Sequence, residues 1–262
     1  MLKHIFIYLF LLMGTILYSQ NIEVTYKVVF KPNTAASNFK TEYMKLQVNG
    51  KKSYFYNANA ITPETQEEKQ DYLRLIVEKD IPSKNLWYYG NLEALRYKFR
   101  QPLDMKWKLS HKKDSIAGYL VQEAFIDFED RKWKAYYTEA IPVQDGPYKF
   151  SGLPGLIVSL QSLDGDYIFE LVELKNVKQE EAYKISANYI EVKRSVIDNK
   201  ISKFIKDPAG ENIQLTNDYN DVYEYEFKGK NSKSYISTTE MLRKRIQKYN
   251  NPIDKKTYIV IP

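Results

Sequence analysis

The chain is dominated by short stretches in which apolar and polar residues alternate. Residues 21–30, NIEVTYKVVF, show this pattern most clearly, with apolar side chains at every even-numbered position from 22 to 30. A period of two is typical of a strand with one buried face. Shorter stretches of the same kind lie at 73–78, 85–90, 92–100 and 105–110. The pattern predicts a succession of short antiparallel strands, which argues against a doubly wound α/β fold.

Turn residues separate several of these stretches and indicate how the strands are joined. Asn49-Gly50 lies between two strand-like runs and is a strong hairpin signal. A second hairpin is predicted to turn around Asp130, and a third at Asp164-Gly165. We expect a polar loop at 61–70, and a polar loop or a loose hairpin across 207–233.

A first helix is predicted near the end of the chain, at 194–207. Ser195 and Asp198 are placed to cap its start, and Pro208 ends it. The expected buried face consists of Ile197, Ile201, Phe204 and Ile205.

A second helix is predicted to follow Ser237. Ser237 and Glu240 have the spacing of a capping box, and Asn251-Pro252 provides a stop. The apolar positions of this helix are Met241, Leu242, Ile246 and Tyr249.

The N-terminus has the pattern of a secretory signal. Lys3 and His4 precede an apolar run over 5–18, which is shorter than the roughly 20 residues that a membrane-spanning helix needs. We interpret 1–19 as a cleaved signal peptide and 20–262 as a single β-rich domain, which predicts a periplasmic or secreted protein. An amphipathic or buried N-terminal element is the alternative.

Composition narrows the chemistry of the exported chain. It has no cysteine, so its fold would stand without disulfides. Without Lys3, the 39 basic residues become 38 against 33 acidic ones, an excess of 5 that weakly favours an anionic ligand or surface. We expect no nucleic-acid partner and no cofactor. Zinc draws on Cys and His, and the sole histidine after the signal, His111, is expected in an exposed Lys-rich turn.

Acidic residues gather in the middle of the chain and offer two kinds of site. A pair of carboxylates serves general acid/base catalysis in hydrolases, but solvated charges beside a hairpin turn are the simpler interpretation. The DGD sequence at 164–166 is short for a calcium loop and doubles as a turn. The acidic candidates are Asp127, Glu129, Asp130, Glu139 and Asp145.

Glycine and proline are concentrated in GPYKFSGLPGLIV, residues 146–158. Pro154-Gly155 fits a type II turn, in which glycine takes the position with positive φ. One interpretation is a rigid corner that leads into a buried strand; the other is a recess that accepts a ligand or a partner segment. It is not a phosphate loop, because no Gly-Lys-Ser/Thr follows.

An aromatic stripe adjoins this stretch and raises the same choice. Trp133, Tyr136, Tyr137, Tyr148 and Phe150 either pack as sheet faces or line a recess for an apolar or extended ligand with an anionic head group. Replacing Tyr148 or Lys149 with Ala should be mild for folding if their side chains face solvent. The candidate recess comprises Trp133, Tyr137, Tyr148, Lys149, Phe150, Gly152, Leu153, Pro154 and Gly155.

The stretch GPYKFSGLPGLIVSL resembles the signature of the GLPGLI family, exported proteins of Bacteroidetes that are also described as a Porphyromonas-type domain of unknown function. The preceding run, 117–150, together with the early EVTYKVVF and the late NNPID, extends the resemblance. A departure lies in KAYYTEAIP, where the family more often has a second Trp. The resemblance implies export but no particular activity.

These observations favour a mainly β protein with α-helices, built as a curved antiparallel sheet or half-barrel with late helices packed on it. We expect a non-enzymatic ligand-binding or accessory protein of outer-membrane processes, whose partner is an apolar or anionic ligand, a peptide or an outer-membrane protein. A carboxylate-based hydrolase is the alternative, and a purely structural role in the cell envelope is a third. Two carboxyls facing each other across a cleft would favour the hydrolase.

Overall fold

The structure is a computed structural model that describes residues 21–57, 73, 75–93, 95–178, 183–185, 188–210, 230 and 232–256. The expected signal peptide at 1–19 and the expected loop at 61–70 lie outside the described residues, as does most of the expected loop at 207–233.

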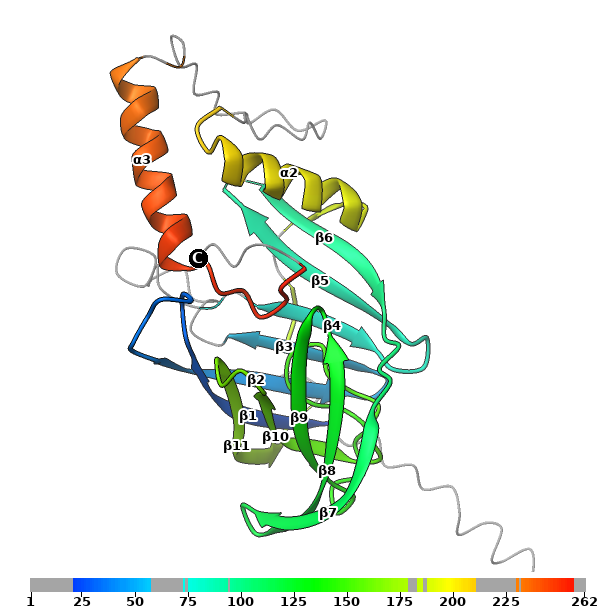
Figure 1. The fold of residues 1–262 in the computed structure, drawn as a ribbon. Helices are drawn as coiled ribbons and strands as arrows, with labels where there is room; N and C mark the ends of the chain where they lie inside the picture. The colour runs from blue at the N-terminus through cyan, green and yellow to red at the C-terminus, as the bar shows by residue number, and fades with distance from the viewer. Residues whose placement is uncertain are drawn as a thin grey trace, which may run out of the picture.

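The described strands form one open sheet (Figure 1). Its order is β12-β6-β5-β4-β3-β2-β1-β11-β10-β9-β8-β7, and every neighbouring pair is antiparallel except β12 and β6. The strands are β1 (Ile22–Phe30), β2 (Lys40–Asn49), β3 (Lys52–Asn57), β4 (Ile76–Asp80), β5 (Asn85–Leu92), β6 (Leu95–Pro102), β7 (Lys108–Ile116), β8 (Tyr119–Phe128), β9 (Arg131–Thr138), β10 (Leu156–Ser162), β11 (Tyr167–Asn176) and β12 (Ile190–Glu191).

The sheet consists of two antiparallel meanders. Strands β1 to β6 follow one another in space as in sequence, and so do β7 to β11. The pairing of β1 with β11 joins the meanders, with Ile22 opposite Asn176 and Phe30 opposite Tyr167. The prediction of a mainly antiparallel sheet followed by helices is therefore confirmed.

The three predicted hairpins are present, and their turn residues have the backbone conformations that tight turns need. Gly50 has φ 60° between β2 and β3, and Gly165 has φ 78° between β10 and β11. Between β8 and β9, both Glu129 and Asp130 have positive φ, at 51° and 60°. Two successive positive φ angles match the right-handed twist of the paired strands.

One predicted strand is displaced. Strand β7 begins at Lys108, so Trp107 precedes it. The Trp107 indole donates Nε1–H to the carbonyl of Ser151 at 2.8 Å. This bond ties the chain before β7 to the loop before β10.

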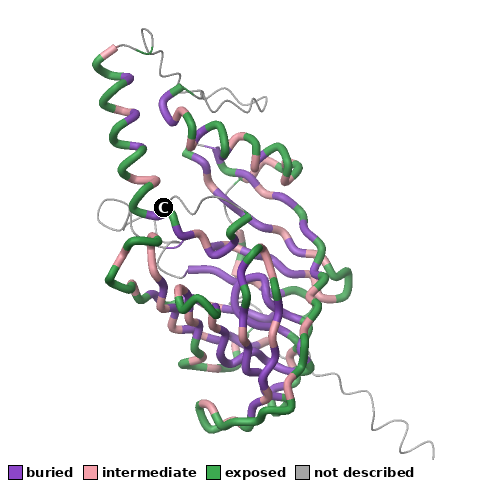
Figure 2. Tube along the Cα trace, viewed as in Figure 1, coloured by how far each residue is buried: buried purple, intermediate pink, exposed green. Residues whose placement is uncertain are grey.

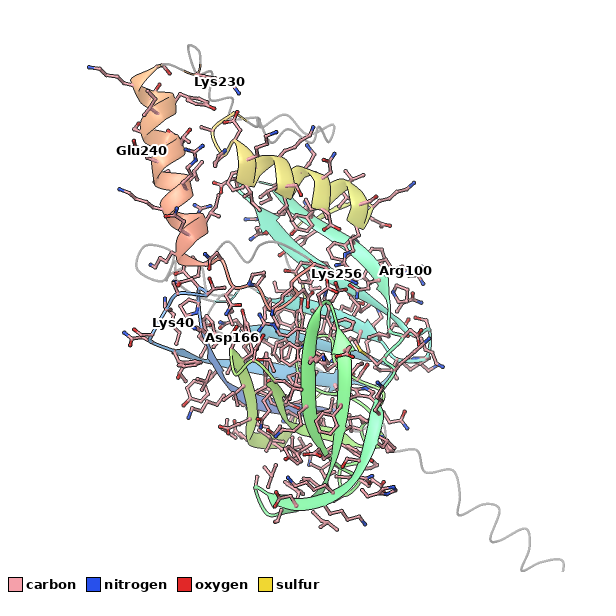
Figure 3. All side chains as sticks on the ribbon, viewed as in Figure 1. Lys40, Arg100, Asp166, Lys230, Glu240 and Lys256 are labelled. Atoms are coloured by element: carbon pink, nitrogen blue, oxygen red, sulfur yellow. The ribbon has the colours of Figure 1, made fainter. Side chains whose placement is uncertain are left out.

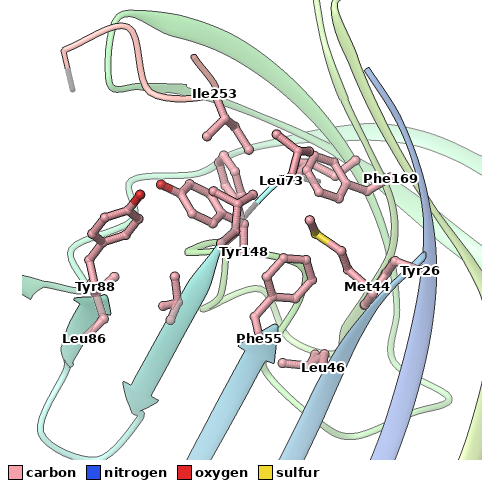
Figure 4. Packing of buried hydrophobic residues seen from close by; sticks show 14 of the residues in the cluster. Tyr26, Met44, Leu46, Phe55, Leu73, Leu86, Tyr88, Tyr148, Phe169 and Ile253 are labelled. Atoms are coloured by element: carbon pink, nitrogen blue, oxygen red, sulfur yellow. The ribbon is translucent and has the colours of Figure 1, made fainter. Parts of the chain in front are cut away.

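Both meanders contribute to one hydrophobic core (Figures 2 and 4). The Phe55 ring lies 6.4 Å from Tyr26 and 6.3 Å from Phe169, centroid to centroid. The Tyr26 hydroxyl donates to the carbonyl of Ile157 at 2.6 Å. A buried hydroxyl needs such a partner, and here it links β1 to β10.

Helix α2 (Arg194–Lys206) lies beside β5 and β6 (Figure 1). Ile197, Ile201 and Phe204 are buried as the sequence predicted. The predicted caps are wrong, because the helix begins at Arg194 and its N-cap position is Lys193, which makes no side-chain capping bond. Ser195 therefore lies inside the first turn.

Helix α3 (Lys233–Lys248) starts earlier than the predicted capping box. The N-cap is Ser232, whose side chain accepts from the Tyr235 N–H at 3.3 Å, and Ser237 lies within the helix. Leu242 is buried, whereas Met241 is 59% exposed, because adjacent helical residues point about 100° apart. Among the described residues, no helix is long and apolar enough to cross a membrane.

Candidate binding site beneath the glycine- and proline-rich loop

The loop between β9 and β10, residues 139–155, folds back into the core. Its two arms are joined by a bridge between Asp145 and Ser151 and by a bond from Gly152 N–H to the Gln144 carbonyl at 3.1 Å. A turn closes its tip, where Phe150 N–H bonds to the Pro147 carbonyl at 3.1 Å. The two residues at the tip of the turn are the central tyrosine and lysine of GPYKF.

Tyr148 and Lys149 therefore point inward, so the condition under which their replacement would be mild for folding is not met. Their exposed fractions are 1% and 0%. Tyr148 has φ 54°, a conformation that is uncommon for a residue other than glycine. This backbone geometry reverses the chain at the tip and directs both side chains into the protein.

The Pro154-Gly155 corner is tighter than the predicted type II turn. The Gly155 N–H bonds to the Leu153 carbonyl at 2.8 Å, which closes a three-residue turn around Pro154. The Leu156 N–H, which a type II turn would use, bonds to Ile141 at 3.1 Å. Gly155 has φ 148°, and a Cβ there would lie 2.0 Å from the carbonyl oxygen of Thr138. Glycine is required at this corner.

The Lys149 ammonium is enclosed by one carboxylate, one amide and three aromatic rings. It donates to Asp254 Oδ2 at 2.5 Å and to Gln101 Oε1 at 3.2 Å. It also lies 4.9 Å from the Tyr88 ring centroid and 5.2 Å from that of Tyr148, and Phe99 provides a third ring at 5.8 Å. Aromatic faces attract a cation that has left water.

The Tyr148 hydroxyl completes the pocket around the carboxylate. It donates to Asp254 Oδ2 at 2.8 Å, the same oxygen that Lys149 contacts. Burial, together with the negative charge of Asp254, raises the pKa of Tyr148 well above its ordinary value. The phenol therefore stays protonated and remains a donor.

A chain of polar contacts runs from this pocket to α2. Gln101 accepts from Lys149 and donates Nε2–H to Glu129 at 3.2 Å. Arg194 holds Glu129 with two hydrogen bonds of 2.6 and 2.7 Å. Burial raises the pKa of Glu129, but the Arg194 guanidinium outweighs it and the net shift is downward. Glu129 is thus held as an anion.

A second buried lysine holds the loop from the opposite side. Lys79, on β4, donates to the Asp145 carboxylate, to the Gly146 carbonyl at 2.7 Å and to the Phe150 carbonyl at 3.4 Å. Burial lowers the pKa of Lys79, while the Asp145 charge opposes this shift. The sequence contained a signal for this burial, because Lys79 lies two residues after the buried Val77 and so points to the same face of the strand.

Arg131 forms the third buried cationic group. Its guanidinium bonds to Asp164 at 2.5 Å and to Asp166 at 3.2 Å, and it lies over the Tyr167 ring. Asp166 is labelled in Figure 3. The DGD turn considered as a calcium loop thus provides anions for an arginine. Burial raises the pKa of Asp164, but hydrogen bonds from Ser162 and Arg131 lower it to about 2.

The predicted recess residues are mostly core residues. Trp133, Tyr137, Tyr148, Lys149, Phe150, Leu153 and Gly155 are buried, and Gly152 and Pro154 are exposed. Tyr136 points to the other face of the sheet, where it packs with Val121 and Val158. The aromatic stripe is therefore divided between two faces, because successive strand residues alternate.

The acidic candidates do not converge. Asp127, Asp130 and Glu139 are exposed, whereas Glu129 and Asp145 each contact a basic side chain. His111 is exposed on β7 and does not lie in a turn. No group of three or more His, Asp or Glu side chains able to hold a metal occurs within the described part of the chain.

The key partner that the sequence analysis missed is Asp254. It lies in the NNPID stretch, 105 residues after Lys149, and nothing in the local pattern indicates that the two side chains meet. Gln101 and Arg131 were missed for the same reason.

Comparisons with known proteins support a mainly β fold but do not indicate an activity. Residues 123–159, which span most of β8, all of β9, the loop and the start of β10, match the model of a family described as Porph_ging, a protein of unknown function. No curated protein matches the chain.

Two crystal structures of PNGF-II have a similar fold. The C2 form aligns with a TM-score of 0.53 at 17% identity, covering 71% of this chain and 33% of that one. The P21 form aligns with a TM-score of 0.52 at 18% identity, covering 71% and 34%. The chain thus spans about a third of PNGF-II, and a likeness at this identity concerns the fold alone.

Proposed function

We propose that the protein is an exported, non-enzymatic binding or accessory protein of the cell envelope, of the GLPGLI type, acting in outer-membrane processes. One observation carries the binding role: Lys149 and Tyr148 both donate to a single carboxylate oxygen inside a pocket with aromatic walls. This donor set recognises an anion. Both side chains are thus used as donors to this oxygen.

The ion pairing of the buried carboxylates argues against the hydrolase alternative. A general acid or base works best with a pKa near the operating pH. The pKa of Glu129 is lowered beside Arg194, and Asp145 contacts Lys79. In the described part of the chain, the acidic candidates thus lack the facing pair that would mark a hydrolase.

The shape that we propose is a half-barrel formed by one domain, 20–262, after removal of 1–19. Support comes from a contact between the last strand of the first meander and a turn of the second. Gln101 on β6 reaches Glu129 in the β8–β9 turn, although these strands are far apart in the sheet order. Such a sheet wraps around its own core.

Expression of the whole precursor in a Gram-negative host, followed by fractionation, tests export. We expect the protein in the periplasmic fraction with an N-terminus near Gln20 or Asn21. Retention of Met1 on exported protein, or recovery only from the cytoplasm, would contradict the proposal.

Native mass spectrometry of the protein purified from that fraction tests binding. We expect part of the parent population to carry an added mass, from a carboxylate-bearing ligand or a peptide that competes with Asp254 for Lys149. This mass should be lost in Lys149→Met and kept in the exposed control Lys132→Ala. A ligand-free parent, with measurable turnover of ester, amide or glycoside substrates that Glu129→Gln abolishes, would favour the hydrolase.

A further inference from the structure

The segment after α3 carries the carboxylate that Lys149 contacts. Asn251, Ile253 and Asp254 are all at least 96% buried, yet residues 250–256 belong to no helix or strand. Ile253 packs in the main hydrophobic cluster with Tyr148 and Phe169 (Figure 4). The segment thus fills the core as an irregular insert that bends at Ile253 and Asp254.

Residues far away in the sequence hold this segment through its main chain. Arg131 donates to the Pro252 carbonyl at 3.1 Å, and the Tyr167 hydroxyl donates to the Asn251 carbonyl at 2.5 Å. The Lys255 N–H bonds to the Glu129 carbonyl at 3.0 Å. Main-chain contacts that provide affinity, with side-chain pockets that provide specificity, are how proteins recognise extended peptides.

The two side-chain pockets select an apolar residue followed by an acid. Ile253 enters the aromatic cluster, and Asp254 enters the pocket of Lys149 and Tyr148. A buried ammonium without an anion is strongly unfavourable, so the pocket requires a carboxylate whichever chain supplies it. The Asn251 side chain adds register, since it accepts from Arg131 at 2.8 Å and donates to the Lys31 carbonyl at 2.8 Å.

The helix that leads to the segment contacts the rest of the chain through polar and apolar side chains, and Arg245 pairs with Glu93. Of its residues, Tyr235, Thr239 and Leu242 are buried, while Ile236 and Met241 are 48% and 59% exposed. In Figure 1, α3 stands at the margin of the fold. Residues 250–256 pair with no strand, so displacement of the segment breaks no strand pairing, although it removes Ile253 from the core.

We propose that the groove holding Asn251–Asp254 is a binding site for an acidic peptide, in which the chain's own segment takes the place of the ligand. This inference rests on the proposed binding function. It adds the class of ligand, a peptide, and the state of the site, which the chain's own segment fills. A peptide is favoured over a fatty acid or a small carboxylate because Arg131 and Tyr167 contact main-chain carbonyls, which those ligands lack.

A fluorescent peptide with the sequence of residues 249–256, added to the full mature chain, tests the proposal. The parent should bind it at least ten times more weakly than the Asp254→Ala variant, because a tethered competitor has a millimolar effective concentration. The same peptide with Asn in place of its Asp should bind Asp254→Ala at least tenfold more weakly. Adding Lys149→Met to Asp254→Ala should remove the preference between the two peptides.

The proposal is overturned if folded Asp254→Ala, checked by circular dichroism, binds neither peptide or binds both equally. It is also overturned if acetate or decanoate competes as well as the unlabelled peptide, since the site would then select a carboxylate alone. Should Asp254→Ala fail to fold, the near-isosteric Asp254→Asn replaces it with the same expected preference. Absence of that preference in Asp254→Asn is again a negative result.

These outcomes separate the inference from the proposed function. If no peptide exchange occurs while native mass spectrometry still shows a ligand on the parent, the inference fails and the binding role stands. If the protein from the periplasm carries no ligand and turns over a substrate, the binding role itself fails.

Discussion

The Lys79 ammonium, on β4, donates to the main-chain carbonyl of Gly146 at 2.7 Å, and so fastens the loop between β9 and β10 to the opposite meander. The same ammonium contacts the Asp145 carboxylate. One side chain of the first meander thus sets the position from which the loop inserts its tip. Lys149 then meets Asp254 on the far side of that tip.

Replacing Lys79 with Ala should destabilise the protein by about 3–5 kcal/mol, because it leaves the buried Asp145 carboxylate without its cation. Urea unfolding followed by tryptophan fluorescence measures the change. The exposed control, Lys132→Ala, should stay within about 0.5 kcal/mol of the parent. A loss below about 1 kcal/mol in Lys79→Ala would mean that the ion pair does not hold the loop.

Gly155→Val should be severe, and Gly152→Ala mild. A Cβ at Gly155 would meet the Thr138 carbonyl oxygen at 2.0 Å, whereas a Cβ at Gly152 meets nothing within 4 Å. Gly152→Ala should therefore lose only the strain of positive φ, about 1 kcal/mol, while Gly155→Val should lose well over twice that or fail to fold. Thermal melts of the two variants and the parent compare these losses of stability. Equal melting temperatures in the two variants would refute the tight corner.

Ser232→Ala should cost about 1 kcal/mol, since the hydroxyl accepts from the Tyr235 N–H at the start of α3. Ser237→Ala should be neutral or slightly stabilising, because that residue lies inside the helix and alanine is the better helix former. Paired urea titrations compare them. A larger loss of stability in Ser237→Ala than in Ser232→Ala would instead support the capping box that the sequence indicated.

The ion pair between Asp164 and Arg131 should make stability fall in acid. The pKa of Asp164 is lowered from 3.8 to about 2 in the folded protein. A lowered folded-state pKa contributes stability that is complete above the unfolded value and is lost as pH falls through the folded value. The stability gap between the parent and Asp164→Asn should thus be constant above about pH 5 and shrink toward pH 2. A gap that is unchanged over this range would contradict the pairing.

Local patterns in the sequence were sufficient for most of the strands and for three of the hairpins. Alternation over 22–30 and the turn residues Asn49-Gly50 and Asp164-Gly165 act within a few residues of one another. Their structure therefore depends on backbone geometry and side-chain polarity that the sequence states directly. The apolar face of α2 was predictable for the same reason.

Only the tertiary structure decided where the charges lie and what the loop does. The glycine and proline residues of 146–155 indicated a sharp corner, but not that the Tyr148 backbone turns Lys149 into the core. A lysine is normally exposed, and its burial here depends on a carboxylate 105 residues away in sequence and on aromatic rings from β5 and β6. Electrostatic partners of this kind act through space, so the sequence determined the strands, and the folding of one meander against the other determined the site.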